Sequence, residues 1–243
     1  HPRVRRQRQM CIRDRGKAIV NRYLQEGCYT IIIYSSDDES AECFRQELDI
    51  NYKDKYEIIK ADLSQIEETE KMCDCVKNNH PKIDYLILNA GVTNRNSFKD
   101  LTIDEWNQVM NVNLTMPFFI VQNLTDCIVR GGRVIFIGAV MGIYPHAISI
   151  PYAVSKAGLH MLSKQLVKHM VPYEITVNVI APGFVDTPWQ KNKPLEQRKR
   201  IENKIAVKRF ALPEEVAKLC WDVSQNAYIN GSVLEIDGGY CYE

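Results

Sequence analysis

Short apolar runs alternate with amphipathic segments along most of the chain. Six runs are rich in β-branched residues and end in polar or glycine-containing turns, which is typical of strands. They cover residues 30–35, 56–62, 84–91, 132–140, 175–183 and 232–239. Because these runs are almost continuously apolar, we expect strands that are buried on both faces, as in a parallel sheet.

Between these runs, apolar residues recur at helical spacing. The predicted helices cover residues 16–27, 38–49, 64–79, 103–129, 152–170 and 213–225. Three of the helix starts carry signals: Ser64 is followed by Glu67 in a capping-box pattern, Thr102 precedes IDEW in the same way, and Pro213 occupies a first helical turn. The alternation of strand and helix predicts an α/β fold with a doubly wound parallel sheet and helices on both faces.

The most irregular internal stretch is 184–205, which is highly charged and follows a predicted strand. In open α/β sheets, ligands bind at the edge where the strands end. We interpret this stretch as a mobile substrate lid, with a plain surface loop as the alternative.

The amino-acid composition argues against several classes of function. The 243 residues are 45% hydrophobic, which is enough for one sizeable core, and the net charge of +1 argues against nucleic acid and anionic membranes as partners. No run approaches the ~20 apolar residues of a membrane span. The eight cysteines are scattered and have no zinc-like spacing, so we expect reduced thiols, no metal and a cytoplasmic location.

The clearest candidate chemistry lies in the segment YAVSK. Tyr152 and Lys156 are four residues apart, so they share one helix face. A tyrosine with a pKa near ~10 is a poor acid or base at neutral pH, but a neighbouring ammonium stabilises the phenolate and lowers that pKa. Such a pair can exchange a proton with a carbonyl or alcohol oxygen. Alone, the pattern occurs by chance in surface helices.

Other motifs accompany it in a fixed order: LNAG at 88–91, NVNL at 111–114 and APG at 181–183. Together with YAVSK they resemble the short-chain dehydrogenase/reductase family, most closely its 3-oxoacyl-ACP-reductase-like members, from about Gly16 to Gly239. The resemblance implies a Rossmann-type fold and hydride transfer between a nicotinamide cofactor and a small-molecule or acyl carbonyl or alcohol substrate. It also implies a homotetramer packed through the helices predicted at 103–129 and 152–170 and through the last strand.

The resemblance assigns roles to individual residues. Tyr152 is the expected general acid in reduction, Lys156 lowers its pKa and holds the nicotinamide ribose, and Asn113 holds a water in a proton relay. The expected cofactor contacts beyond Tyr152 and Lys156 are Gly16, Asp62, Leu63, Asn89, Ala90, Gly91, Pro182, Gly183, Val185 and Thr187. For Asn89 and Asn113, the ordinary alternative is side-chain capping of the backbone.

The choice of cofactor depends on the end of the strand predicted at 30–35. Enzymes of this fold that use NAD place an acid there, and here Tyr34 occupies the position. Ser35 and Ser36 follow it and can donate to a 2′-phosphate, whereas the carboxylates of Asp37 and Asp38 repel one. We predict NADP, with NAD as the alternative.

One departure from the family pattern is chemical. Members usually carry a serine thirteen residues before the active tyrosine, and here that position is Ala139. Losing one donor to the reacting oxygen can cost ~10²–10³ in rate. Ser149 is our preferred substitute, with Tyr144 and His146 as others. Alternatively, the enzyme is slow or tuned to an unusual substrate, or the chain is a non-catalytic nucleotide-binding or scaffold protein. The intact Tyr152, Lys156 and Asn113 favour an enzyme.

The other departure lies at the N-terminus. The family's first strand ends in a T-G-x-x-x-G-x-G loop that holds the pyrophosphate, and only Gly16 fits that pattern. The segment RQMCIRDR resembles the peptide produced when sequencing-adapter sequence is translated. We therefore expect residues 1–15 to be non-native or disordered, residues 16–243 to form a single domain, and the first, central strand to be missing or degraded. A genuine, divergent N-terminus is the alternative.

The first fifteen residues contain six arginines and one aspartate. A nucleic-acid-binding arm is one interpretation of this cluster, but its adapter-like sequence argues against it. The substrate is less defined. Acyl-carrier-protein docking in the related reductases uses basic residues beside the active-site entrance. Arg130 is one candidate, but Tyr173 stands where a second arginine is expected. Sugars, hydroxysteroids and small ketones remain open.

Overall fold

The computed structural model describes residues 14–145 and 149–242; residues 1–13, 146–148 and 243 are not described. The expected replacement of the first strand therefore falls almost wholly outside the described residues, as does His146. Within them, no helix is long and apolar enough to cross a membrane.

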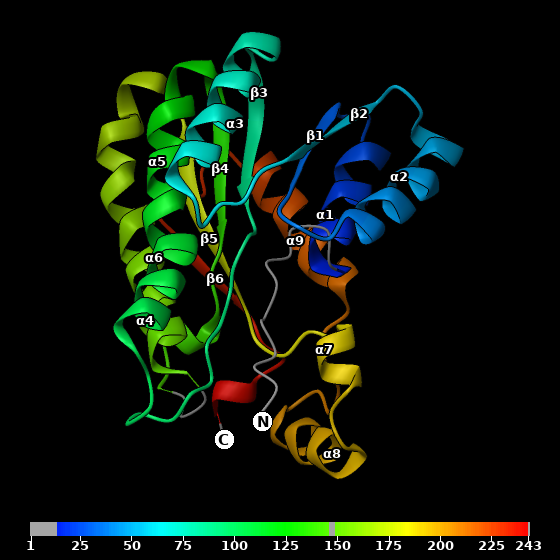
Figure 1. Cartoon of the computed structure of the whole chain (residues 1–243), viewed down its shortest axis with the longest axis vertical. Helices are drawn as coiled ribbons and strands as arrows, with labels where there is room; N and C mark the ends of the chain where they lie inside the picture. The colour runs from blue at the N-terminus through cyan, green and yellow to red at the C-terminus, as the bar shows by residue number, and fades with distance from the viewer. Residues whose placement is uncertain (1–13, 146–148, 243) are drawn as a thin grey trace.

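Six parallel strands form two sheets (Figure 1). In the smaller sheet, β1 (Thr30–Tyr34) pairs with β2 (Tyr56–Lys60). The larger sheet has the order β3-β4-β5-β6. Its strands are Ile83–Leu88, Ile128–Ile137, Thr176–Pro182 and Val233–Ile236. Among the described residues, no strand pairs with both β1 and β3.

Nine helices of α type alternate with these strands along the described chain. They are α1 (Asp14–Gln25), α2 (Asp38–Tyr52), α3 (Ile66–Asn79), α4 (Ile103–Met110), α5 (Met116–Leu124), α6 (Ile150–Met170), α7 (Pro188–Lys191), α8 (Leu195–Lys204) and α9 (Pro213–Gln225). A π-helical turn, Asn111–Thr115, joins α4 to α5. Figure 1 places α7 and α8 together at the end of the molecule where β5 and β6 end.

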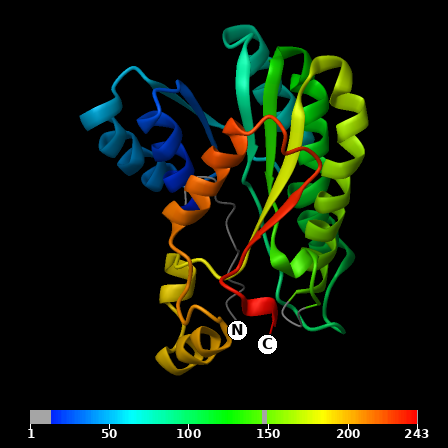
Figure 2. The same ribbon diagram turned by 180° about the vertical axis from the view of Figure 1, so that it is seen from behind.

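Alternate side chains of β4 point to opposite faces of the larger sheet. Val134 and Phe136 pack with α5 and α6, whereas Ile135 and Ile137 pack with α1 and α9. Figure 2 shows α9 on the face turned away from α6. The near-continuous apolar sequence of this strand is thus explained, because helices cover both of its faces.

The structure corrects several predicted boundaries. The helix predicted over 103–129 ends at Leu124, and β4 begins at Ile128, earlier than predicted. The capping box at Thr102 is confirmed, and Pro213 occupies the first turn of α9. The cap predicted at Ser64 is wrong: α3 begins at Ile66, and the backbone N–H and the hydroxyl of Ser64 both donate to the Asp62 carboxylate.

The irregular stretch predicted at 184–205 is largely helical, because it contains α7 and α8. Arg198 of α8 donates to the Asp186 carboxylate over 2.9 Å, and its guanidinium lies 4.7 Å from the ring centre of Phe210. These contacts hold α8 close to the end of β5.

Candidate active site

Tyr152 and Lys156 lie on the first two turns of α6. The Lys156 ammonium lies 5.8 Å from the centre of the Tyr152 ring and donates to the carbonyl oxygen of Ile137 over 2.7 Å. Lys156 is almost fully buried, whereas Tyr152 is partly exposed. The helical spacing therefore places the phenol and the ammonium on one face of α6, with Lys156 reaching the end of β4.

Asn113 reaches the same place from the π-helical turn, and π-bulges are frequent at functional sites. It is fully buried, and its amide exchanges hydrogen bonds with the backbone of Val92 over 2.8 and 2.9 Å. The amide also donates over 2.9 Å to the hydroxyl of Ser155, which in turn donates to the carbonyl of Tyr152. The alternative role considered for Asn113, a side chain that caps the backbone, is therefore present in the structure. Its hydrogen bonds fix the loop after β3 and the start of α6.

Burial controls the protonation of the pair. Removal from water raises the pKa of Tyr152, an effect that the charge of Arg15 opposes. Burial, together with Arg15, lowers the pKa of Lys156 to about 7. The sequence argument expected Lys156 to lower the pKa of Tyr152, and here desolvation outweighs any such effect. Tyr152 is consequently a protonated phenol at neutral pH, which is the form of a general acid.

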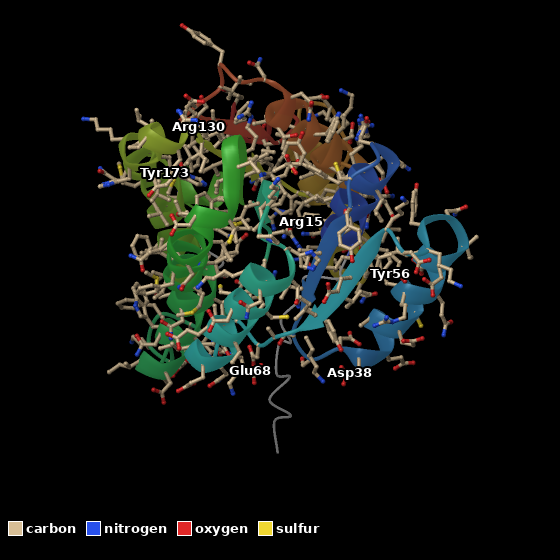
Figure 3. All side chains as sticks on the ribbon, turned by 90° about the horizontal axis from the view of Figure 1, so that it is seen from above. Arg15, Asp38, Tyr56, Glu68, Arg130 and Tyr173 are labelled. Atoms are coloured by element: carbon tan, nitrogen blue, oxygen red, sulfur yellow. The ribbon has the colours of Figure 1, made fainter. Side chains whose placement is uncertain are left out.

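Arg15 is a residue that sequence reasoning missed, because it stands inside the segment expected to be non-native. It belongs to the first turn of α1, which begins two residues earlier than predicted (Figure 3). Its positive charge acts on both Tyr152 and Lys156. Arg15 lies far from both residues in the sequence, so no local sequence pattern predicts this electrostatic effect.

His160 occupies the space beside Ala139, the position of the absent serine. The backbone N–H of Ala139 donates to Nε2 of His160 over 3.4 Å. A Cβ added to Gly138 would lie only 2.3 Å from that same nitrogen. Burial and the nearby Lys156 lower the pKa of His160 to about 4, so the ring is neutral. Sequence reasoning missed His160, although its position one turn after Lys156 was a usable signal.

Ser149 immediately precedes α6, three residues before Tyr152. Its side chain is buried, and its hydroxyl oxygen has no hydrogen-bond partner in the described part of the chain. Of the other two proposed substitutes, His146 is not described. The pKa of Tyr144 is raised by desolvation and by the Glu235 carboxylate. Ser149 thus offers a hydroxyl without a partner among the described residues at the start of the helix that carries Tyr152.

The loop after β3 brings the LNAG motif to this site. A Cβ added to Gly91 would lie 3.4 Å from Oδ1 of Asn113 and 3.5 Å from Nζ of Lys156, so glycine keeps this backbone close to both side chains. Oδ1 of Asn89 is buried and has no partner among the described residues. Asn89 and Ala90 also line a cavity between β1 and β3.

The other predicted cofactor residues spread along the ends of the strands. Gly16 is buried in the first turn of α1. Ser35, buried, and Ser36, exposed, follow β1. After β2, the Asp62 carboxylate is engaged by Ser64, and Leu63 is buried against α3.

Beyond β5, the APG motif approaches the end of β6. A Cβ added to Gly183 would lie 2.8 Å from Cβ of Asp237. Pro182 and Val185 are buried, and Val185 belongs to the core beneath α1 and α9. Thr187 immediately precedes α7. The structure therefore places these residues at one edge of the molecule, without testing their roles.

The family model described as short chain dehydrogenase matches residues 15–198. The chain belongs to this family. This short-chain dehydrogenase is 31% identical over 230 residues to the 3-oxoacyl-[acyl-carrier-protein] reductase FabG of Aquifex aeolicus, covering 92% of each chain. It is 29% identical to glucose 1-dehydrogenase 2 of Bacillus subtilis, covering 92% of this chain and 89% of that one.

Two solved structures are similar to this short-chain dehydrogenase along its length. A short-chain dehydrogenase/reductase from Serratia marcescens has a TM-score of 0.87 at 29% identity, covering 94% of both chains. The RhlG/NADP active-site complex of Pseudomonas aeruginosa has a TM-score of 0.86 at 30% identity, covering 94% of this chain and 93% of that one. These likenesses confirm the predicted Rossmann-type fold.

The basic residue considered for carrier-protein docking lies away from the phenol. Arg130 stands near the start of β4, whereas the site lies at the ends of the strands. Its guanidinium pairs with Glu174 over 2.5 Å, close to Tyr173 (Figure 3). Within a single copy of this dehydrogenase, Arg130 therefore does not flank the site.

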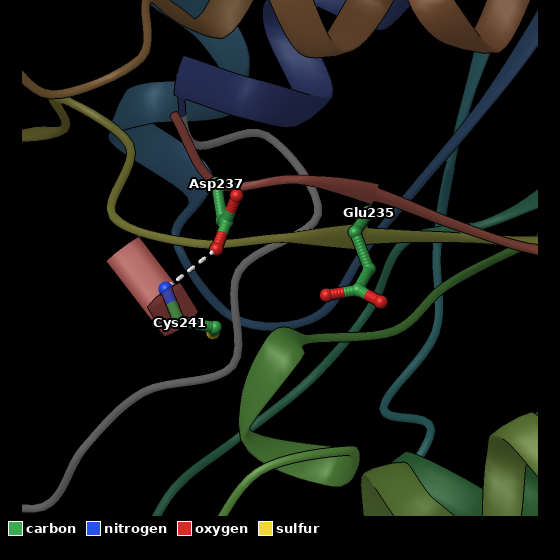
Figure 4. Close-up of side chains that lie close together, drawn as sticks. All are labelled: Glu235, Asp237 and Cys241. Carbon is green, nitrogen blue, oxygen red and sulfur yellow. Dashed lines mark hydrogen bonds between the residues drawn. The ribbon is translucent and has the colours of Figure 1, made fainter. Parts of the chain in front are cut away.

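A group of potential metal-ligand atoms gathers at the end of β6, from Glu235, Asp237 and Cys241 (Figure 4). The Asp237 carboxylate accepts the backbone N–H groups of Gly239 over 2.9 Å and of Cys241 over 3.0 Å. Burial and Asp237 raise the pKa of Cys241 to about 12, which opposes the thiolate that a metal requires. The carboxylate thus stabilises the final turn of the described chain.

Proposed function

We propose that this protein is an NADP(H)-dependent oxidoreductase that reduces a carbonyl group or oxidises a secondary alcohol. The observation that carries the proposal is the assembly of Tyr152, Lys156 and Asn113 around the ends of β3 and β4. Tyr152 and Lys156 belong to one helix, and Asn113 connects to that helix through Ser155. Seven free cysteines among the described residues also support a reducing, cytoplasmic setting.

The residues at the strand ends fit a nicotinamide cofactor. The unpartnered Oδ1 of Asn89 supplies a buried acceptor, and Gly91 lets the backbone approach Lys156 closely. Gly16 at the start of α1 offers N–H groups to a diphosphate, and Lys156 would hold the ribose beside the nicotinamide. When bound, the reduced cofactor supplies the hydride.

The preference for NADP over NAD is supported at the ends of β1 and β2. The Asp38 carboxylate, which the sequence suggested would repel a phosphate, is paired with Lys60 over 2.8 Å and accepts from Tyr34 over 3.0 Å (Figure 3). Tyr34 and Lys60 are register partners, and Ser35 follows directly. The RhlG structure, described as an NADP complex, is consistent with this choice.

In reduction, the phenol of Tyr152 gives its proton to the substrate oxygen. Ser149 donates a hydrogen bond to the same oxygen and so takes the place of the serine absent at Ala139. Lys156 returns a proton toward Tyr152, and Asn113 keeps Lys156 and the loop after β3 in place. The substrate class remains a small-molecule or acyl carbonyl or alcohol, and the FabG relative favours a 3-oxoacyl group.

The second candidate function is a catalytically impaired nucleotide-binding or scaffold protein. Ala139 favours it, because its side chain offers no donor to a reacting oxygen and its backbone N–H is directed to His160. The two functions share a nucleotide site and differ only in turnover.

We would test both by titrating NADPH and NADH against the protein by nicotinamide fluorescence and then measuring turnover over a panel of ketones, 3-oxoacyl thioesters and alcohols. The proposal expects tighter NADPH binding, measurable turnover, and a loss of about 10²–10⁴ in kcat for Tyr152→Phe with the Kd for NADPH unchanged. The matched control is Tyr228→Phe, at a tyrosine that is 98% exposed.

Binding without turnover in the unmodified protein would select the scaffold function. Both measurements are repeated on a variant that carries a strand and a T-G-x-x-x-G-x-G loop ahead of residue 16. If that variant bound neither nucleotide, both functions would be wrong.

A further inference from the structure

Two positively charged side chains from different loops act on one another at the active-site end of the molecule. Lys193 lies between α7 and α8, and Arg95 belongs to the loop between β3 and α4. Figure 1 places both segments at the end of the molecule where β5 ends. The charge of Arg95 lowers the pKa of Lys193, so the two side chains are within electrostatic reach of one another. We call Arg95 and Lys193 the cationic pair.

Lys193 lacks the anionic partner that a half-buried ammonium group usually has. Within residues 14–145 and 149–242 it pairs with no carboxylate, and its ammonium lies 5.6 Å from the centre of the Phe184 ring. Burial lowers the pKa of Lys193, and the charges of Arg95 and Arg198 lower it further. Because a desolvated cation among like charges is unfavourable, an anion that binds here is stabilised.

Arg198 shows how a cation in the same region is neutralised. Its guanidinium pairs with Asp186 over 2.9 Å and with Glu202 over 3.5 Å. These two carboxylates are therefore engaged by Arg198 and leave the charge of Lys193 unmatched. One negative charge is missing beside Lys193, and a single carboxylate group supplies it.

The support of Lys193 is continuous with the catalytic centre. Met141 packs against the small core that contains Phe184, and it follows Ala139 by two residues. A Cβ added to Gly142 would lie 2.7 Å from the carbonyl carbon of Lys156, so this segment rests on the helix that carries the catalytic lysine. The ammonium of Lys193 is thus connected to the site through a short series of packed side chains.

Arg95 approaches the site from the opposite loop. That loop is held at Val92 by the amide of Asn113, and at Asn96 by a 2.6 Å hydrogen bond from its side chain to Glu105. Arg95 stands between these two anchors. Its side chain is exposed, and desolvation nevertheless lowers its pKa. A guanidinium in this position is accessible to a ligand and has the planar geometry that binds a carboxylate through two N–H groups.

We propose that the cationic pair is a substrate subsite that binds the carboxylate of an oxo acid, while the carbonyl of the same molecule receives the proton of Tyr152. The inference rests on the proposed function and narrows its substrates to carbonyl compounds that carry a carboxylate, or to the corresponding hydroxy acids in oxidation. The carbonyl is reduced as the proposed function describes, and the carboxylate is left unchanged.

The test compares acids with their neutral esters in the full chain. We would measure kcat/KM with NADPH for 4-oxopentanoate, 5-oxohexanoate and 6-oxoheptanoate, each beside its methyl ester. The series varies the distance between carbonyl and carboxylate. For the preferred length, we expect the acid to exceed its ester by about tenfold or more in kcat/KM, mainly through a lower KM.

Variants of the cationic pair locate the subsite. Lys193→Gln and Arg95→Gln should each reduce the acid-to-ester ratio toward one, whereas Lys193→Arg, which keeps the charge, should retain most of the preference. Lys199→Gln, at an exposed position of α8, is the matched control and should show the ratio of the unmodified chain.

Calorimetric titration of the same acids separates this inference from the proposed function. The titration is made with NADP⁺ present, because the oxidised cofactor cannot reduce the acid. Acid binding that Lys193→Gln removes, without turnover of any compound, would support the subsite and contradict the reductase function.

Three results would overturn the subsite. The first is turnover of the esters that equals turnover of the acids. The second is a weaker Kd for NADPH in Lys193→Gln, because Lys193 would then bind the phosphates of the cofactor. The third is the absence of both turnover and binding of the acids at about 1 mM.

Discussion

At the scale of single residues, the site is defined by titratable side chains that burial removes from water. Lys156 is almost fully buried, and this desolvation, together with the positive charge of Arg15, lowers its pKa to about 7. Tyr152 stays protonated for the same reason, with burial raising its pKa. The pKa values of the two residues thus move apart and make Lys156 the stronger acid, which favours transfer of a proton from Lys156 to a phenolate at Tyr152.

The lowered pKa of Lys156 makes stability depend on pH. Between about pH 7 and its ordinary value of 10.5, the unfolded chain binds a proton that the folded chain does not, so this group makes stability rise with pH across that window. The slope approaches about 1.4 kcal/mol per pH unit. Denaturant unfolding of the unmodified protein and of Lys156→Met, compared from pH 7 to pH 9, should show this difference in slope.

The thiols of Cys73 and Cys220, whose pKa values burial raises, titrate in both proteins and cancel in that comparison. Lys164→Met, at an exposed position of α6, serves as the control and should keep the slope of the unmodified protein. Identical slopes for Lys156→Met and the unmodified chain would show that Lys156 titrates normally in the folded state.

Ser149 gives a prediction about catalysis. Its buried hydroxyl has no partner among the described residues, so it is free to donate to a reacting oxygen. We expect Ser149→Ala to lower kcat by about 10²–10³ with the Kd for NADPH unchanged, and Ala139→Ser to restore part of the loss in the double variant. Ser232→Ala, distant in the chain from this loop, is the control. An unchanged kcat in Ser149→Ala would show that a group other than Ser149 donates to the reacting oxygen.

Sequence and structure agree on these residues where the signal is local. The spacing of Tyr152 and Lys156 follows from helical periodicity, and the absent hydroxyl at Ala139 can be read directly. Arg15 cannot be found in this way, because its effect on Lys156 depends on where the folded chain places α1. His160 lies one helical turn after Lys156, which is a local signal that the sequence argument did not use. The direction of the Tyr152 pKa depends on burial, which no short motif encodes.

At the scale of elements, the π-helical turn between α4 and α5 positions Asn113. Hydrophobic periodicity predicted a single long helix here, because a π turn adds one residue without interrupting the apolar pattern. The strands were predicted well, since apolar runs buried on both sides mark them. The element boundaries at Ser64 and Ile128 were predicted wrongly. The hydrogen bonds of Ser64 to Asp62 decide the first, and the pairing of Ile128 with Ile83 decides the second.

The helices that follow β5 give a prediction at this scale. Arg198 joins α8 to Asp186 and packs on Phe210, so these contacts tether the stretch that the sequence predicts to be a mobile substrate lid. Arg198→Gln should release α8, with faster amide exchange over 195–204 and a several-fold higher KM for substrate at nearly constant kcat. Arg200→Gln, exposed on the same helix, is the matched control. Unchanged exchange in Arg198→Gln would show that α8 is held by other contacts.

At the scale of the whole molecule, the two sheets share helices but no hydrogen-bonded strand pair among the described residues. α1 connects them, because Leu24 packs with the small sheet while Ile19 and Tyr23 pack with the large one. We infer that cooperativity between the two sheets depends on α1.

The outer surface of α5 and α6 bears on assembly. Phe119, Val154 and Met161 are 42%, 42% and 54% exposed, and the last two lie seven residues apart on one face of α6. Exposed large apolar side chains on the outer faces of helices are typical of a subunit interface. We therefore expect the homotetramer that the family resemblance implies, with this surface buried between copies.

Light scattering after size-exclusion chromatography tests that assembly. The unmodified chain should elute with four times the 28.0 kDa chain mass, and Val154→Lys combined with Met161→Lys should dissociate it, because two ammonium groups would be buried at each contact without partners. Ile50→Lys, equally exposed but on α2, should leave the mass unchanged. A monomeric unmodified chain would contradict the prediction. So would a double variant of unaltered mass, since charges that leave the assembly intact cannot lie in its interface.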